Sequence, residues 1–583
     1  TGKTLLLSVR AGSILKNRIG VLPDNILILT YTNSAAKAMK ERLAKVMGIE
    51  GYDVEVGTFH SFANSIIQES EEAANYVGDK VQITEVEQVR LIEYIIDRAK
   101  GVEEIRPFRA PYLYLDEIIR RIGELKRDGI RPKDYAEYLK KQDKGELAYM
   151  EDKHIRRLEG LAVVYKMYEE LKESGCADLF DERGRYDFDD MIIFATEALK
   201  HERALRKKYA DLFRYVMVDE YQDTNGAQLE LLFTMLDYED PNLCCVGDDD
   251  QSIYRFQGAS VGNFKLLNVR YPNTKVLRLK ENYRSAKELI NISTRIINLI
   301  PAEERMAEKA LEPMKSYRDR DIEFREFTTE EEELLYLVDK IRALKDKISG
   351  DAALSREDSG AHTYNSIAIL VRKRKDILKV VGALLQAGIP YATDGKENIA
   401  GESRVKQLLD VLKLAHLDPT DQTANDLALY KVLSADYLEI PHIDVLRFIS
   451  HVNNKRMKEK RLDLALVTEF LEYFSSGGGD IRFDSPGKMK SSAGAIGRLL
   501  SDSRTKPVHT LLLEFIKDAG IFTHVLKKYD EKTILRIREL RALSSFVNMV
   551  KLSDLARPGI GLDDFMLEIK TRENHGLSIQ GSL

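Results

Sequence analysis

The stretch YVMVDEYQDTNGAQ, from Tyr215 to Gln228, carries the most information about the fold of this chain. The apolar run in YVMVD (Tyr215 to Asp219) predicts a buried strand. Two carboxylates, Asp219 and Glu220, stand at its C-terminal end, which is the end where an open parallel sheet binds its ligands. One carboxylate can hold Mg²⁺ while its neighbour deprotonates an attacking water. A solvated Asp-Glu pair that merely ends a strand is the alternative interpretation.

Other stretches predict further strands of the same sheet and the helices between them. The apolar periodicity after Lys3 predicts a first helix, a second covers residues 33–47 with Asn33 or Ser34 as its N-cap, and a third starts at about His60. Three more buried strands are predicted, at NILILT (25–30), VEVGT (54–58) and NLCCVG (242–247). Strands that alternate with helices predict the α/β class with a parallel, doubly wound sheet.

The rest of the chain divides into a helical insertion and a third block. Residues 83–185 hold charged amphipathic helical stretches without a convincing strand, so we expect an insertion into the first sheet domain. The third block begins near residue 275, with predicted strands at KVLRL (275–279) and SIAILVR (366–372) and a helix after the second. Beyond about residue 400 the chain is expected to be largely helical.

Composition narrows the class of protein. A chain of 583 residues exceeds one hydrophobic core, and its length suggests roughly three to five domains. It has no long uncharged apolar run, so no membrane span is expected, and three cysteines indicate a reducing, cytoplasmic setting without a disulfide framework. The net charge of −6 does not suggest nucleic acid as a partner. A groove that follows a nucleic-acid backbone, however, needs only local positive charge.

Three short motifs add to the carboxylate pair. TGKT (Thr1 to Thr4) has the form of the end of a phosphate-binding loop, although G-K-[ST] alone is a weak signal. Three aspartates and Gln251 follow the strand at 242–247, where Gln251 is able to orient a water or sense a terminal phosphate. Tyr283 offers a ring for a base and Arg284 a guanidinium for a phosphate, although such a pair is often surface packing.

Together these motifs resemble the UvrD/Rep/PcrA group of superfamily one DNA helicases. The matching stretches span residues 1 to about 300: TGKT, LTYTNSAAKAMKERL, GTFHSFANSII, VDEYQDTNGAQ, VGDDDQSIYRFQGAS and LKENYRS. The resemblance implies two RecA-like (P-loop NTPase) motor domains with parallel sheets, each interrupted by a mostly helical insertion. It implies an ATP-dependent, DNA-stimulated helicase that uses Mg²⁺ and moves 3′ to 5′ on single-stranded DNA, with single/double-strand junctions as partners. Repair, recombination and replication are the expected settings.

The resemblance also implies a role for each motif residue. Thr1 and Gly2 would complete the phosphate loop, Lys3 would bind the β- and γ-phosphates, and Thr4 and Asp219 would hold Mg²⁺. Glu220 would be the catalytic base, and Gln251 would couple the γ-phosphate to bound DNA. Tyr283 would stack on adenine and Arg284 would act as an arginine finger. The implied nucleic-acid contacts are Tyr31, Thr32, Asn33, Thr58, His60, Tyr254 and Phe256.

The resemblance further predicts the domain boundaries. The first motor domain covers 1–82 and 186–279 around the insertion at 83–185. Residues 280–400 form the first part of the second motor domain, and residues 401–583 form the helical insertion of that domain. The first glycine of the phosphate loop and the closing helicase segments are absent, so we expect a fragment whose second motor domain is incomplete. Gln257 replaces a usual arginine, and YLEIPHIDVLRF stands where relatives carry a G-I-G hairpin, which puts duplex contacts there in doubt. A helicase–nuclease arm and a protein-displacing translocase are the alternatives.

Overall fold

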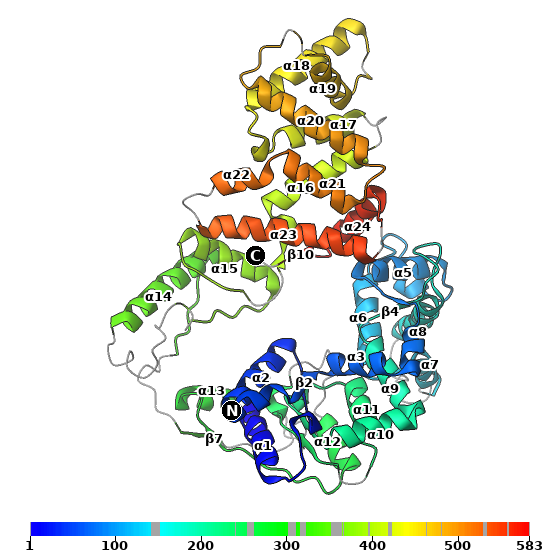
Figure 1. The fold of residues 1–583 in the computed structure, drawn as a ribbon, viewed down its shortest axis with the longest axis vertical. Coiled ribbons are helices and arrows are strands. Elements are labelled where there is room, and N and C mark those ends of the chain that lie inside the picture. The colour runs from blue at the N-terminus through cyan, green and yellow to red at the C-terminus, as the bar shows by residue number, and fades with distance from the viewer. Residues whose placement is uncertain are drawn as a thin grey trace. The chain divides into compact units, whose positions relative to one another are not determined.

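The computed structural model describes most of the chain in two compact units, Thr1–Ile322 and Glu323–Leu583 (Figure 1). The described residues are 2–141, 152–238, 241–252, 262–300, 311–314, 322–350, 364, 367–393, 397–417, 422–461, 463–477, 479, 481–528, 533–556 and 559–581. Each unit is described by itself below.

A four-stranded parallel sheet forms the centre of the first unit. Its strands are β1 (Ile26–Thr30), β2 (Glu55–Thr58), β5 (Tyr215–Val218) and β6 (Leu243–Cys245), in the order β2-β1-β5-β6. Ile28 pairs with Val56 on one side and with Met217 on the other, which brings stretches almost two hundred residues apart into register. The predicted parallel α/β sheet is therefore confirmed.

Helices cover both faces of this sheet, as its alternating side chains require. Ile26, Ile28 and Met217 pack against α1 (Lys3–Asn17) and α2 (Asn33–Met47). Leu27, Leu29 and their neighbours on β5 face the opposite way. They pack with α3 (Phe59–Glu69), α9 (Asp190–His201), α10 (Arg203–Leu212) and α11 (Gly226–Met235). In Figure 1 the dark blue α1 and α2 and the blue-green α9, α10 and α11 lie around this sheet.

The N-cap of α2 differs from the prediction. Neither Asn33 nor Ser34 caps the helix; Thr32 does, because its backbone is extended and its hydroxyl accepts the Ala35 N–H at 3.1 Å. The cap lies one residue earlier than the polar pattern suggested, since Asn33 already has helical geometry and forms the first residue of α2.

The segment between the two halves of the sheet is mostly helical. Its helices are α5 (Glu85–Arg98), α6 (Leu115–Arg127), α7 (Pro132–Lys141) and α8 (Asp152–Ser174), and α4 (Glu71–Val77) precedes them. Two short parallel strands, β3 (Val81–Gln82) and β4 (Arg185–Tyr186), join the two ends of the segment. The insertion therefore leaves and rejoins the sheet domain at one place.

Two predicted strands do not form. Residues 275–279 have no strand, and Leu277 is 86% exposed; the chain pairs only further on, where β7 (Glu281–Asn282) lies parallel to β8 (Glu312–Pro313). Residues 367–372 also lack a strand, with Leu370 94% exposed, and Ser366 lies outside the described residues. An apolar run becomes a strand only when a neighbouring backbone pairs with it, and no described segment does so here. In the first unit, the helices α12 (Gly262–Arg270) and α13 (Lys287–Ile297) come before and after residues 275–279 in the chain.

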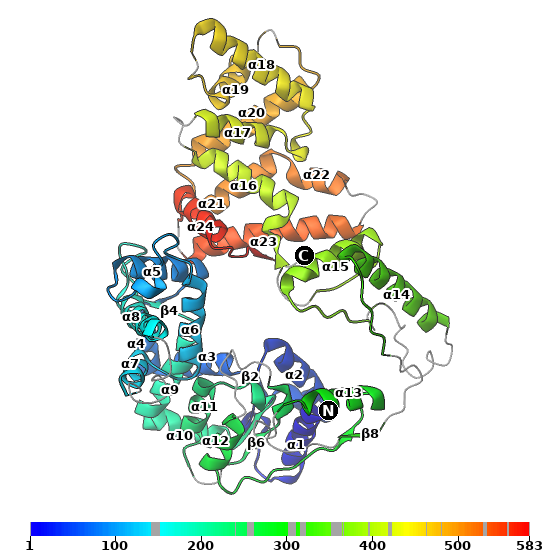
Figure 2. The ribbon, with the colours of Figure 1, turned by 180° about the vertical axis from the view of Figure 1, so that it is seen from behind.

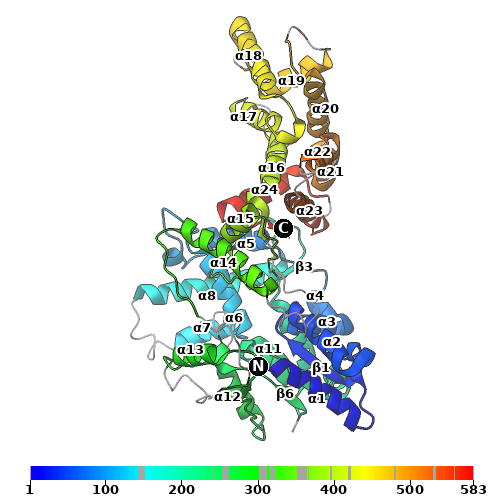
Figure 3. The same cartoon turned by 90° about the vertical axis from the view of Figure 1, so that its left-hand side faces the viewer.

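The second unit is largely helical, as predicted beyond residue 400 (Figure 2). First come α14 (Glu330–Gly350) and α15 (Arg374–Gln386), which pack through Val338, Ile341 and Leu384. A larger helical core follows, which Figure 3 shows from the side. Its helices are α16 (Ser403–His416), α17 (Gln422–Leu433), α18 (His442–Glu459), α19 (Leu466–Ser475), α20 (Pro486–Asp502), α21 (Val508–Asp518), α22 (Ile521–Lys528), α23 (Thr533–Ala556) and α24 (Leu562–Asn574). The antiparallel pair β9 (Glu397–Asn398) and β10 (Gln580–Gly581) joins its two ends. Across the described ranges of both units, no helix combines the length and apolarity that a membrane crossing would need.

Candidate nucleotide site

The acidic pair lies where the chain leaves β5 and turns sharply. The Asp219 N–H donates to the Leu29 carbonyl on β1 at 2.9 Å, so the ladder continues to this point. Glu220 then adopts left-handed backbone geometry with φ of 48°, which is uncommon for a residue other than glycine. The next residue, Tyr221, donates its N–H to the Val246 carbonyl. The turn is therefore held between the ends of β1 and β6, at the carboxyl edge of the sheet.

Lys3 and Glu220 form an ion pair across this edge. Lys3 Nζ lies 2.7 Å from Glu220 Oε2, and Gln222 Nε2 donates to the same oxygen at 2.8 Å. Burial alone would raise the pKa of Glu220, but the hydrogen bonds from Gln222 and Lys3 outweigh burial and lower it. The carboxylate is therefore held ionised, which is the form that accepts a proton.

Thr4 and Asp219 form the second contact of the site. The Thr4 hydroxyl lies beside the Asp219 carboxylate. Burial and the neighbouring charge of Glu220 raise the pKa of Asp219, and the nearby Thr4 hydroxyl partly opposes them. A hydroxyl beside a buried carboxylate is a donor set that suits a hard cation such as Mg²⁺, whose charge would relieve this crowding of negative groups. The residues present therefore fit the implied metal.

The start of α1 is suited to an anion. Gly2 precedes the helix with φ of 102°, and a Cβ at this position would meet no atom within 4 Å. The first turn of this 15-residue helix carries no acidic residue, so its exposed N–H groups and the Lys3 ammonium present positive charge together. The arrangement fits a phosphate. Thr1 lies outside the described residues.

A second turn stands beside the first, at the end of β6. Gln251 ends a short 3₁₀ turn, Asp249–Gln251, and donates to Asp248 Oδ2 at 2.6 Å. The Asp248 N–H in turn donates to Gln222 Oε1 at 2.9 Å. The structure thus brings Lys3, Thr4, Asp219 and Glu220 into contact and links them through Gln222 to the turn that carries Gln251.

Tyr283 and Arg284 show local contacts. The exposed Tyr283 hydroxyl contacts the Glu281 carboxylate, and the Arg284 N–H donates to Asn282 Oδ1 at 2.9 Å. Their predicted roles toward adenine and phosphate stay predictions.

The proposed nucleic-acid contacts lie at the carboxyl ends of β1 and β2. Tyr31 is half-buried just after β1, followed by Thr32 as the helix cap and the exposed Asn33. The hydroxyl of Thr58 accepts the Ser61 N–H at 3.1 Å and so caps α3. Tyr254 and Phe256 lie outside the described residues.

His60 stacks on the exposed ring of Phe188, which lies outside the helicase-like motifs. Its imidazole lies 3.8 Å from the Phe188 ring, centroid to centroid, with 19° between the planes. Burial lowers the pKa of His60 to about 4, and its buried Nε2 has no hydrogen-bond partner among the described residues. A neutral imidazole thus supports one face of Phe188. The signal for Phe188 in the sequence was its place inside YDFDD, an apolar residue among aspartates at a helix start.

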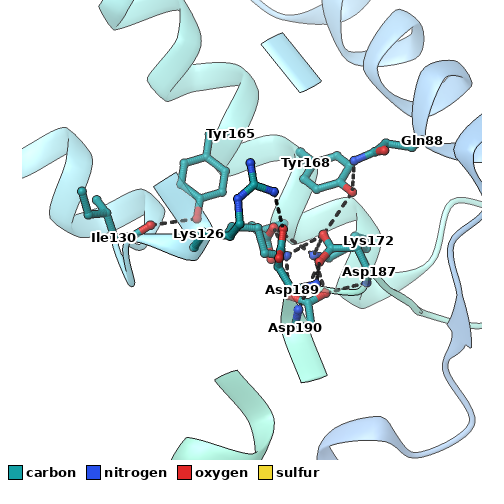
Figure 4. Close-up of polar contacts among 11 residues, drawn as sticks. Gln88, Lys126, Ile130, Tyr165, Tyr168, Lys172, Asp187, Asp189 and Asp190 are labelled. Carbon is teal, nitrogen blue, oxygen red and sulfur yellow. Dashed lines mark hydrogen bonds and ion pairs between the residues drawn. The ribbon is translucent and has the colours of Figure 1, made fainter. Parts of the chain in front are cut away.

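A buried ion cluster holds the turn that carries Phe188 (Figure 4). Lys126 of α6 is 2% exposed and lies 2.5 Å from carboxylate oxygens of both Asp187 and Asp190. Lys172 of α8, 3% exposed, contacts the same two aspartates at 3.0 and 2.7 Å. The nearby aspartates raise the pKa of Lys126 well above its usual value against the opposing effect of burial.

Three carboxylates of this cluster lie close enough together to hold a metal ion. Glu169, Asp187 and Asp190 place oxygens within 4.8 Å of one another. The two ammonium groups lie among these oxygens, at 2.5 to 3.3 Å, and balance two of the three negative charges. We therefore interpret the cluster as an internal salt-bridge network and not as a metal site.

Two further residues of the turn after β5 had no predicted role. Gln222 and Asp223 are buried within the motif that supplied Asp219 and Glu220. Burial, assisted by the charge of Glu220, raises the pKa of Asp223 to about 6. Both residues lie within the polar connection between β5 and α11, so their polarity alone did not set them apart.

Family models match most of the chain. Residues 1–272 match the UvrD/REP helicase N-terminal domain, and residues 277–471 match the UvrD-like helicase C-terminal domain. The parallel sheet, the phosphate-compatible helix start and the acidic pair define a protein of the RecA-like motor class. Within that class, the chain belongs to the UvrD-like helicase family.

Curated relatives agree with this family. The ATP-dependent DNA helicase PcrA of Staphylococcus epidermidis is 27% identical over 434 residues, which cover 74% of this chain and 52% of the relative. PcrA of Leuconostoc citreum is 28% identical over 429 residues, 73% of this chain and 50% of the relative. The putative ATP-dependent DNA helicase YjcD of Bacillus subtilis is 29% identical over 454 residues, which cover 77% of this chain and 52% of the relative. The chain spans about half the length of the curated relatives it matches.

Proposed function

We propose that this chain is the motor part of an ATP-dependent DNA helicase that moves 3′ to 5′ on single-stranded DNA. The observation that carries the proposal is the contact of Lys3 with Glu220 beside the contact of Thr4 with Asp219, at the carboxyl edge of a parallel sheet. Family membership and the names of the relatives support the activity, and the motif resemblance supports the direction.

The residues divide the work on the nucleotide. Gly2 and the start of α1, with Lys3, bind the phosphates, while Thr4 and Asp219 hold Mg²⁺, which supplies charge neutralisation for phosphoryl transfer. Glu220 accepts the proton of the attacking water. A phosphate competes with Glu220 for the Lys3 ammonium, so binding of the nucleotide releases the carboxylate from its ion pair. Arg284 and Tyr283 act on the phosphate and the base, and Gln251 senses the terminal phosphate.

The nucleic-acid side lies at the ends of β1 and β2 and on Phe188. Aromatic rings bind single strands by stacking, which tolerates any base and so suits a motor that moves along DNA. Tyr31, His60 and Phe188 supply such rings, with Thr32, Asn33 and Thr58 beside them. Tyr254 and Phe256 belong to the same proposed surface. We place the protein in the cytoplasm, with single/double-strand junctions as its substrates in repair, recombination or replication.

We propose the domain division that the motifs imply. The first motor domain comprises 1–82 and 186–279, with the insertion at 83–185, and the second starts at 280 with its insertion from 401. The family models meet between residues 272 and 277, which supports the boundary near 280.

The test uses a protein that contains these 583 residues. Glu220→Gln should lower ATP turnover by about a hundredfold or more while nucleotide affinity is kept, because only the general base is lost. Lys3→Ala should weaken nucleotide binding itself. Turnover with and without single-stranded DNA and the affinity for a fluorescent ATP analogue are measured, and strand displacement is compared on 3′-tailed and 5′-tailed duplexes.

Glu230→Gln is the matched control. Glu230 is exposed on α11, ten residues after the base, and pairs only with the Lys200 side chain in the contacts that the structure shows. This variant should keep wild-type turnover. The proposal is wrong if Glu220→Gln keeps turnover within a few-fold of wild type.

A further inference from the structure

Gln222 connects two turns that belong to different strands. Its side chain is 2% exposed and lies between the end of β5 and the end of β6. Nε2 donates to Glu220 Oε2 at 2.8 Å, and Oε1 accepts the Asp248 N–H at 2.9 Å. One buried amide thus joins the base to the turn that carries Gln251.

The chemistry of this bridge requires an amide. The Asp248 N–H can only donate, and an ionised Glu220 can only accept, so the amide has one orientation that satisfies both. A carboxylate in its place would accept from Asp248 but repel Glu220. An apolar side chain would leave both partners without their bond. Hydrogen bonds to charged groups are also stronger than those between neutral groups.

The backbone beside the bridge is built for close approach. A Cβ at Gly247 would lie 2.8 Å from Gln222 Oε1 and 2.8 Å from the Phe264 ring. Only glycine lets the β6 turn come this near to the amide. The bridge therefore depends on side chain and backbone together.

Glu220 Oε2 receives two donors, Lys3 and Gln222. If Lys3 turns to a phosphate, as proposed above, the Gln222 amide is the donor that still holds this oxygen. The position of the base then depends on the β6 turn through Gln222. Conversely, a shift of the β6 turn is transmitted to the base.

We propose that Gln222 is a positioning residue that couples Glu220 to the 248–251 turn, so that nucleotide state and DNA affinity depend on each other through it. The inference rests on the proposed ATP-dependent DNA motor and deepens it. Because coupling between two ligands is reciprocal, it can be measured from binding alone.

The experiment compares Gln222→Met and Gln222→Glu with wild type in a protein that contains these residues. The first readout is the ratio of single-stranded DNA affinities with and without a non-hydrolysable ATP analogue. In wild type this ratio should differ from one by roughly fivefold or more. In Gln222→Met it should move toward one, while nucleotide affinity without DNA stays within about threefold, because Lys3 and Thr4 are intact. DNA-stimulated turnover should fall by about tenfold or more in both variants, and further in Gln222→Glu.

Gln228→Met is the matched control. Gln228 is another buried glutamine, six residues later in the chain, and its amide oxygen accepts the Asn225 N–H at the start of α11. This variant should lower the melting temperature but keep the wild-type affinity ratio.

Two results would overturn the inference. One is a wild-type affinity ratio in Gln222→Met. The other is an equal loss of the ratio in Gln228→Met, which would make the effect one of general destabilisation. A wild-type protein that neither hydrolyses ATP nor binds DNA would instead refute the proposed function, and the inference with it.

Discussion

At the scale of single residues, the site is organised by shared partners. Glu220 Oε2 accepts hydrogen bonds from both Lys3 and Gln222, so the proposed base is held by one group that a phosphate would attract away and by one that it would not. Asp219 lies beside the Thr4 hydroxyl and next to the like charge of Glu220. The two adjacent carboxylates therefore have opposite pKa shifts, which matches the two different roles proposed for them.

His60 makes a pH-dependent prediction at the same scale. Its folded pKa of about 4 lies below its ordinary value of 6.5, so between these values the unfolded chain binds a proton that the folded chain does not. Stability should therefore fall as the pH drops from 6.5 to 4, by at most about 1.4 kcal/mol per pH unit from this residue.

The measurement is the free energy of unfolding against pH, compared between wild type and His60→Phe. The phenyl ring keeps the stack on Phe188 but does not titrate. Below pH 6.5, the free energy of unfolding of the variant should increase progressively relative to that of wild type. A difference that stays constant over this range would contradict the assignment of a buried neutral imidazole.

At the scale of elements, the start of α2 shows why one residue matters. The helix begins with Asn33, and the cap is the extended Thr32, one residue after the half-buried Tyr31. Capping thus orients the loop that joins β1 to α2, which is also the proposed nucleic-acid edge of the sheet.

Removing this cap should weaken the first unit. Thr32→Ala should lower the free energy of unfolding by about 1 kcal/mol, because the Ala35 N–H loses its side-chain acceptor. Asn33→Ala, at an exposed position inside the helix, should change it by less than about 0.5 kcal/mol. Hydrogen exchange of the first-turn amides of α2 measures both. Equal effects of the two substitutions would contradict the assignment of Thr32 as the N-cap.

At the scale of the first unit, a buried ion cluster joins the helical insertion to the sheet domain. Lys126 and Lys172 come from α6 and α8 of the insertion, while Asp187 and Asp190 lie at the start of α9, which packs on the sheet. The Asp187 N–H donates to Asp190 Oδ2 at 2.7 Å, so the same aspartates also shape the turn that presents Phe188. The insertion and the proposed DNA surface are therefore mechanically connected.

Breaking the cluster from one side should be costly. Lys126→Met leaves two buried aspartates with one ammonium in place of two, and we expect a loss of about 3–5 kcal/mol in the stability of this region. Lys166→Met, on the exposed side of α8, removes a surface pair with Glu170 and should cost less than about 1 kcal/mol. Hydrogen exchange of α6 and α8 reports the local stability. A loss as small for Lys126→Met as for Lys166→Met would show that the cluster does not hold the insertion.

The sequence alone determined the sheet of the first unit and which residues would meet in the candidate nucleotide site. The strands around residues 28, 217 and 244 are short apolar runs, as a parallel sheet covered on both faces requires, and Val56 supplies the buried apolar residue of the edge strand β2. Because parallel strands bring their carboxyl ends to one edge, the meeting of Asp219 and Glu220 with the chain's first residues followed from the order of elements. The motifs at Lys3 and Thr4 supplied the rest.

The tertiary structure alone decided which apolar runs paired and which polar side chains met. Residues 275–279 and 367–372 have the composition of strands but no pairing backbone in the described parts of the chain, and pairing is a property of the neighbour and not of the run. The cap at Thr32 depended on local backbone geometry, which one-residue shifts in the polar pattern do not reveal. The Gln222 bridge, the stack of His60 on Phe188 and the lysine–aspartate cluster each join residues distant in sequence or in different turns. Contacts of this kind arise from three-dimensional proximity, which no spacing along the chain encodes.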